Sequence, residues 1–180
     1  HEFLGKLGSP ELGGYELDLF RERQMAYYNA EVKALWEMGE VMDRDNGPFI
    51  HDATCIFCEI EDECVVNNVG LRTLFVYLKT DKEAEALVLQ RAQDYPKPLF
   101  FPKAFLLDSV YDYLAQEGLE DVSQIVPDEF SRWVFPRLFE ARKPKYQSLA
   151  DKYGVTIEAS AFSNLASAEE FVDIIAGHLD

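Results

Sequence analysis

The chain has few basic residues, few cysteines and no long apolar run, and each shortage excludes a class of protein. It carries 17 Lys and Arg against 33 Asp and Glu, a formal net charge of −16, which disfavours binding to nucleic acid and to anionic lipid. Its apolar runs are shorter than the roughly 20 residues that span a bilayer, and no signal peptide opens the sequence. An odd number of cysteines, three, is typical of a reducing compartment. We therefore expect a cytoplasmic protein that binds neither nucleic acid nor membrane.

What the chain does have is enough apolar material for one core. Of its 180 residues, 48% are hydrophobic and 13% aromatic, which predicts a single domain over residues 1–180. The sequence begins at His1 rather than Met, and we expect residues upstream to be missing. The opening stretch "LGKLGSPELGG" contains Gly5-Lys6 but does not fit the phosphate-binding pattern G-x4-G-K-[ST].

The apolar periodicity predicts helices interrupted by short strands. Helices are expected over 16–43, 81–93, 103–117, from Pro127 onward, over 145–153 and over 167–178, and strands at 48–52 ("PFIHD"), 73–79 ("TLFVYLK") and 155–159 ("VTIEA"). Pro136 should kink the helix that begins at Pro127, and Pro144 should end it. Leu87 and Val88 are expected to be buried. Strands separated by helices favour an α/β fold with a parallel sheet covered by helices.

A cluster of sulfur and nitrogen side chains raises the question of a metal site. Its members are His51, Cys55, Cys58 and Cys64, and four such ligands suffice for tetrahedral zinc. However, all four lie close together in the sequence, and the intervening Ile56 and Phe57 are large and apolar. The simpler interpretation is that the cysteines are small buried hydrophobic residues beside a sheet.

Asp52 is the first candidate for a catalytic residue. It follows the short apolar run "PFI", and a carboxylate at the carboxyl end of a parallel strand faces the crevice where such sheets bind ligands. In phosphate-transfer proteins an aspartate at this place holds Mg²⁺, directly or through water. The alternative is an ordinary turn residue.

A basic stretch in this acidic chain suggests a phosphate site. Residues 132–145, "RWVFPRLFEARKPK", hold Arg132, Arg137, Arg142, Lys143 and Lys145 with a single acid, Glu140. Guanidinium groups bind phosphate oxygens in a bidentate manner. The alternative is a solvated helix face. Arg91 is a further candidate, although it also suits the negative end of its helix.

Several stretches resemble a bacterial family labelled as P-loop ATPases, with a kinase-like build. They are "LGKLGSPELGGYELDLFRERQ", "FIHDATCIFCEIED", "TLFVYLKT", "PKPLFF" and "FSRWVFPRLFEARKPKYQSLADKYGVTIEA". The order of strand, helix, arginine and proline-leucine turn also resembles shikimate-kinase-like and nucleotide-kinase-like folds. Family members carry an N-terminal strand, the G-x4-G-K-[ST] loop and a helix, which this sequence lacks.

The resemblance implies a helix-rich, three-layer P-loop NTPase-like fold with a parallel sheet, N-terminally incomplete here. It implies that Asp52 organises Mg²⁺ through water and that residues 94–145 form a lid or helical insertion. It further implies phosphate contacts from Arg91, Arg132, Arg137 and Arg142.

The first hypothesis is therefore an ATP-binding P-loop NTPase, either an ATPase or a small-molecule kinase, that uses Mg²⁺ and ATP and is inactive as this fragment. Its partners are a nucleotide and an unidentified small-molecule phosphate acceptor. Two alternatives remain: a non-catalytic acidic interaction module whose long first helix binds a partner, and a small zinc-binding domain built on His51, Cys55, Cys58 and Cys64.

Overall fold

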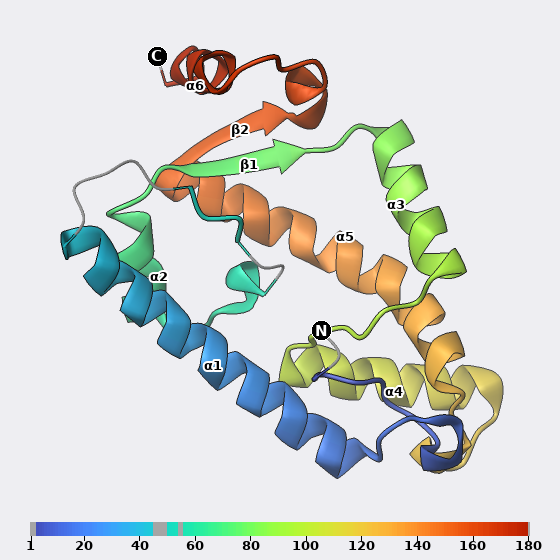
Figure 1. Ribbon diagram of the computed structural model, residues 1–180. Coiled ribbons are helices and arrows are strands. Elements are labelled where there is room, and N and C mark those ends of the chain that lie inside the picture. Colours follow the sequence, from blue (N-terminus) through green and yellow to red (C-terminus); the bar gives the residue numbers. More distant parts are fainter. Residues whose placement is uncertain (1–2, 45–49, 54–55, 180) are drawn as a thin grey trace. The chain divides into compact units, whose positions relative to one another are not determined.

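The computed structural model consists mainly of helices, with one small sheet (Figure 1). It describes residues 3–44, 50–53 and 56–179. The α-helices are α1 (Leu17–Arg44), α2 (Glu63–Gly70), α3 (Lys82–Asp94), α4 (Lys103–Glu117), α5 (Pro127–Tyr153) and α6 (Ala168–Ala176), and the strands are β1 (Phe75–Lys79) and β2 (Gly154–Glu158). Short 3-10 turns are η1 (Pro10–Leu12), η2 (Phe57–Glu59), η3 (Val122–Gln124) and η4 (Ala159–Phe162). No helix in the described part is long and apolar enough to cross a membrane.

The sheet corrects the predicted fold class. Within the described residues it contains only β1 and β2, which pair in parallel from Phe75 opposite Gly154 to Lys79 opposite Glu158. The three-layer parallel sheet of a P-loop NTPase is therefore not what this chain forms, and that prediction is wrong. The strand expected at 48–52 is absent where it is described: residues 50–53 are irregular, and the Ile50 side chain is 79% exposed. Pro48 and Phe49 lie outside the described residues.

By its internal contacts the chain divides into two compact units. Unit 1 contains residues 1–33 and 89–140, and unit 2 contains residues 34–88 and 141–180. Each unit therefore combines segments that are distant in the sequence, and α1, α3 and α5 each contribute one part to either unit. The predicted lid or helical insertion over 94–145 falls almost entirely in unit 1 and stays a prediction.

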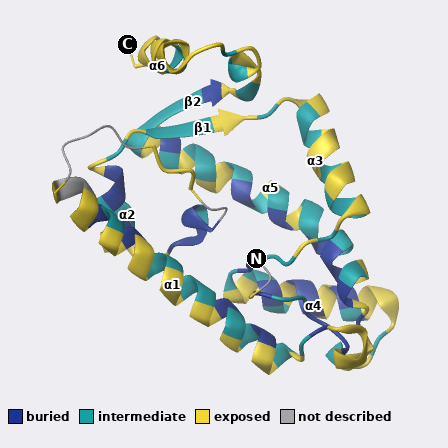
Figure 2. Cartoon of the chain, in the orientation of Figure 1, coloured by how far each residue is buried: buried dark blue, intermediate teal, exposed yellow. Residues whose placement is uncertain are grey.

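Unit 1 is built around an aromatic-rich core. The core residues come from the N-terminal loop, the first part of α1, α4 and the first part of α5: Leu7, Phe20, Phe101, Leu106, Val110, Tyr113, Ile125, Phe130, Val134 and Leu138. Dark-blue segments in Figure 2 mark such buried positions along α4 and α5. The helix predicted over 103–117 is confirmed, and it ends at Gly118 in the left-handed conformation.

A buried glutamine fixes the proline-rich segment that follows α3. Gln24 of α1 is 5% exposed. Its Nε2 donates to the Leu99 carbonyl at 3.0 Å, and its Oε1 accepts from the Phe101 amide at 2.8 Å. Because a proline-rich segment cannot form a helix or a central strand, its buried backbone groups need side-chain partners of this kind.

The N-terminal loop is folded onto unit 1 rather than being a loose connection. Leu4 and Leu7 are each 1% exposed, and the Ser9 amide donates to the Ile125 carbonyl at 2.8 Å. Gly8 lies at φ 138°, and a Cβ there would meet the Ile125 oxygen at 2.6 Å. Only glycine suits this position, because it needs both a positive φ and a close approach of two backbones.

In unit 2 the sheet packs against the last part of α5. The ring of Tyr77 on β1 stacks on Tyr146 of α5 with centroids 5.7 Å apart, and Gln147 donates from Nε2 to the Thr156 hydroxyl at 2.9 Å. The final helix begins where the sequence predicts, because the Ser167 hydroxyl accepts from the Glu170 amide. These contacts place α5 on one face of the two-stranded sheet.

Two helix predictions need correction. Helix α5 continues past Pro144, which was expected to end it. It also runs through Pro136, where the expected kink stays a prediction. The carbonyl that Pro136 leaves without its usual helical donor, that of Arg132, accepts a hydrogen bond from Gln93 Nε2 at 2.9 Å instead. In α3 the predicted burial of Leu87 and Val88 is wrong, since they are 72% and 37% exposed.

Candidate functional site

The predicted site residues are divided between the two units. Asp52 and Arg142 belong to unit 2, whereas Arg91, Arg132 and Arg137 belong to unit 1. The expected meeting of Asp52 with the arginines of unit 1 therefore stays a prediction. Within each unit, the structure shows the hydrogen-bond partners and the exposure of each arginine.

Asp52 lies in the exposed irregular segment 50–53 and does not end a strand. The buried apolar residues of this region come later, at Ile56, Phe57 and Ile60, so burial begins downstream of the predicted strand. Asp52 is thus an exposed carboxylate in an irregular segment, without the sheet edge that was expected to orient it.

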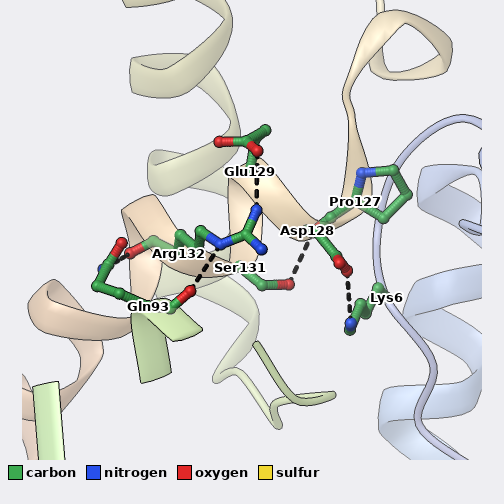
Figure 3. Close-up of polar contacts among 7 residues, drawn as sticks. All are labelled: Lys6, Gln93, Pro127, Asp128, Glu129, Ser131 and Arg132. Carbon is green, nitrogen blue, oxygen red and sulfur yellow. Dashed lines mark hydrogen bonds and ion pairs between the residues drawn. The ribbon is translucent and has the colours of Figure 1, made fainter. Parts of the chain in front are cut away.

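The first turn of α5 carries a group of charged side chains (Figure 3). Helix α5 begins with Pro127, and Asp128 and Glu129 follow at its positive end, where acidic residues are favourable. Lys6 of the N-terminal loop donates from Nζ to Asp128 Oδ1 at 2.5 Å. This ion pair ties the loop to the helix and neutralises one of the two acids.

Arg132 is held in one orientation by two acceptors, as Figure 3 shows. Its Nε donates to the main-chain carbonyl of Gln93 at 2.8 Å, and its Nη1 donates to Glu129 Oε1 at 2.8 Å. A guanidinium group has five N–H donors, so three remain without an acceptor among the described residues. The side chain as a whole is 30% exposed, so Arg132 is partly open to solvent.

Arg137 is exposed and stacked on an aromatic ring. Its Cζ lies 3.7 Å from the centroid of the Trp133 ring, and its Nη1 donates to the Trp133 carbonyl at 2.8 Å. Trp133 is fixed in turn by a bond from Nε1 to Gln116 Oε1 at 2.9 Å. Stacking occupies one face of the guanidinium group and leaves its edge free for a planar acceptor. Arg91, in the last turn of α3, is also exposed.

Arg142 is committed to a buried ion cluster that the sequence interpretation missed. Its Nε donates to Glu59 Oε1 at 3.0 Å, and Lys145 Nζ contacts Glu59 Oε2. The Glu59 side chain is 1% exposed and that of Arg142 is 9% exposed. The available signal was an acid placed between the apolar residues Phe57 and Ile60, together with two cations three residues apart on a helix. The cluster stabilises unit 2 and occupies Arg142.

The predicted zinc ligands are only partly described. Cys55 lies outside the described residues. Cys64 is exposed, whereas burial raises the pKa of the Cys58 thiol to about 11, against a smaller lowering effect of its hydrogen bond with Tyr146. A raised pKa keeps the thiol protonated, whereas zinc binds the thiolate. Among the described residues no group of three or more His, Cys, Asp or Glu side chains could hold a metal ion.

The surface of α6 bears a shallow hollow of about 270 Å³, lined by Ala168, Glu169, Val172 and Asp173. Its two carboxylates make it unfavourable for phosphate groups. The chain matches no protein-family model, no curated protein and no solved structure.

Proposed function

We propose that this chain supplies phosphate contacts to an ATP-binding NTPase, which hydrolyses ATP or transfers its terminal phosphoryl group to a small molecule. The resemblance described above supports this proposal. The observation that carries it is the state of Arg132. Two acceptors fix its guanidinium group, three of its N–H donors have no acceptor among the described residues, and the side chain is 30% exposed.

Phosphoryl transfer depends on positioning and on neutralising charge on the phosphate oxygens. A fixed arginine is suited to this task, because little side-chain freedom is lost when the phosphate binds. Arg91 and Arg137 are two more exposed guanidinium groups of the same unit. The proposed phosphate contacts are therefore Arg91, Arg132 and Arg137, and Arg142 is left out because Glu59 occupies it.

Mg²⁺ would accompany the nucleotide. It is usually held by one or two carboxylates together with waters and phosphate oxygens, and the exposed carboxylate of Asp52 fits that chemistry. When bound, Mg²⁺ neutralises charge on the phosphates. The role left to unit 1 is to donate hydrogen bonds from its arginines.

The test is a titration of the isotopically labelled chain with Mg·ATP, followed by NMR. Because the sequence lacks G-x4-G-K-[ST], we expect weak but saturable binding, with a dissociation constant on the order of 1 mM. Shifted amides should lie in α3 and the first part of α5. Tripolyphosphate should reproduce these shifts, whereas adenosine should not.

Variants then identify the contacts. Arg132→Ala and Arg137→Ala should each weaken Mg·ATP binding about tenfold, because each removes a charge-assisted hydrogen bond worth about 1.5–3 kcal/mol. Arg21→Ala is the matched control: it removes the same charge from the exposed surface of α1 and should change binding less than twofold. Absence of saturable binding, or equal weakening by all three substitutions, would refute the proposal.

A further inference from the structure

Strand β1 has a partner on one side only. In a parallel pair, alternate residues of a strand bond to one neighbour, so half of the N–H and C=O groups of Phe75–Lys79 point away from β2. Within residues 3–44, 50–53 and 56–179 no further strand joins the sheet. Among these described residues, the free side of β1 is therefore a row of backbone donors and acceptors without a strand partner.

The same strand also exposes an apolar row. Leu74 and Leu78 are 44% and 47% exposed. In the register of the sheet Leu78 is paired with Ile157 of β2, so both side chains lie on one face, yet Ile157 is 1% exposed. This face is the opposite one to that on which Tyr77 stacks against α5. On it, the β2 side chain Ile157 is buried, whereas the β1 side chain Leu78 is exposed.

This combination is unusual for a parallel sheet. Parallel strands occur almost only where both faces are covered, and a two-stranded sheet by itself is marginally stable. Natural edge strands are commonly shielded by a charge, a proline or a bulge that points at the edge. Strand β1 ends in a charged residue, Lys79, but its ammonium group lies 3.9 Å from the carboxylate of Glu158 on β2. The charge of Lys79 is therefore offset within the sheet.

An unpaired strand edge forms backbone hydrogen bonds with another extended polypeptide segment. The net charge of −16 opposes pairing with a second copy and favours a basic partner. We propose that the free edge of β1 binds an extended basic segment of another polypeptide. This segment adds as a strand beside β1 and places apolar side chains next to Leu74 and Leu78.

The probe is a labelled ten-residue peptide that alternates lysine with valine. Its control has the same side chains and charge, but every backbone nitrogen is methylated, which removes the N–H donors from both edges of the strand. We expect the unmodified peptide to bind at least tenfold more tightly. Hydrogen exchange should then show new protection at Phe75–Lys79.

Leu78→Lys should weaken peptide binding at least tenfold, because it places a charge at the edge. Leu87→Lys in α3 is the matched control, since it makes the same substitution at a residue that is 72% exposed in the same unit; binding should change less than twofold. Leu74→Lys is a second edge variant, and circular dichroism confirms that each variant is folded.

Four results would overturn the proposal. They are equal binding of the two peptides, equal loss in Leu78→Lys and Leu87→Lys, protection outside β1, and no binding at all. Sedimentation of the chain as a dimer that Leu78→Lys dissociates would also overturn it, since the edge would then belong to a second copy.

Discussion

At the scale of single residues, the buried carboxylate of Glu59 is the group whose loss should matter most for stability. It neutralises Arg142 and Lys145 while its own side chain is 1% exposed. Glu59→Gln removes the negative charge that faces the buried guanidinium group of Arg142, which we expect to lower the free energy of unfolding by about 3 kcal/mol. Urea unfolding followed by circular dichroism measures this loss.

Glu158→Gln provides the comparison. Glu158 forms an ion pair with Lys79 in the same unit, but both side chains are more than half exposed, and surface pairs contribute about 0–1 kcal/mol. The two substitutions change the charge equally, so a similar loss in both would show that burial of Glu59 is not the cause.

The Cys58 thiol gives a residue-scale prediction with a defined pH window. Burial raises its pKa from 9.0 to about 11, so the folded chain keeps the proton over a range in which the unfolded chain releases it. Reaction with iodoacetamide should therefore be slow at Cys58 below pH 9 and accelerate as the pH rises toward 11. The exposed Cys64 should react first at pH 8, as peptide mass spectrometry can show.

The raised pKa of Cys58 also makes the stability of the folded chain depend on pH. Between pH 9 and pH 11 the unfolded state loses the Cys58 proton while the folded state retains it, so this thiol lowers the free energy of unfolding as the pH rises. Cys58→Ala removes that contribution. If Cys58 reacts as fast as Cys64 at pH 8 in the folded chain, the thiol is not buried as described.

At the scale of elements, α5 shows how a helix can continue through a proline. Pro136 has no N–H to donate to the carbonyl of Arg132, and Gln93 Nε2 supplies that bond at 2.9 Å. We expect Gln93→Ala to lower the free energy of unfolding by about 1–3 kcal/mol, because it leaves a partly buried carbonyl unsatisfied. Chemical denaturation of the variant measures the loss.

A double-mutant cycle isolates the cause. With Pro136→Ala in the background, the alanine amide at 136 can donate to the Arg132 carbonyl, so Gln93→Ala should then be less costly by 1 kcal/mol or more. An equal cost in both backgrounds would mean that the Gln93 side chain stabilises the chain in another way than through its bond to the Arg132 carbonyl. The bond from Arg132 Nε is not that other contact, because its acceptor is the main-chain carbonyl of residue 93, which alanine keeps.

At the scale of the whole molecule, local sequence patterns predicted most helices and two of the strands, but they did not predict the small size of the sheet. The helices from Leu17, Lys103 and Ala168 begin close to the predicted positions, because apolar periodicity and caps are local signals. The third strand was inferred from "PFIHD", a run too short to distinguish a strand from an irregular segment. Continuity through Pro136 depended on Gln93, which is distant in the sequence, and no local pattern could reveal it.

For the candidate site, too, local sequence signals were informative and contacts between distant residues were not predictable. Basic composition drew attention to the stretch from Arg132 to Lys145, but it could not distinguish exposed arginines from one that is buried in an ion pair. That distinction depends on Glu59, which lies 83 residues from Arg142. Pairing over such a distance is a property of the folded units, so the sequence could not separate the exposed arginines from the buried one.

The net charge of −16 gives a prediction for the molecule as a whole. Like charges repel one another more strongly in the compact state than in the unfolded chain, and salt screens this repulsion. The melting temperature should therefore rise by a few degrees between 20 mM and 300 mM NaCl.

Variants of exposed acidic residues test this explanation. Replacing Glu11, Asp112 and Glu120 by lysine should raise the melting temperature at 20 mM NaCl and reduce its salt dependence. The charge-conserving replacements Glu11→Asp, Asp112→Glu and Glu120→Asp should do neither. A melting temperature that falls with salt would show that the internal ion pairs, led by Glu59 with Arg142, outweigh the repulsion among the surplus acids.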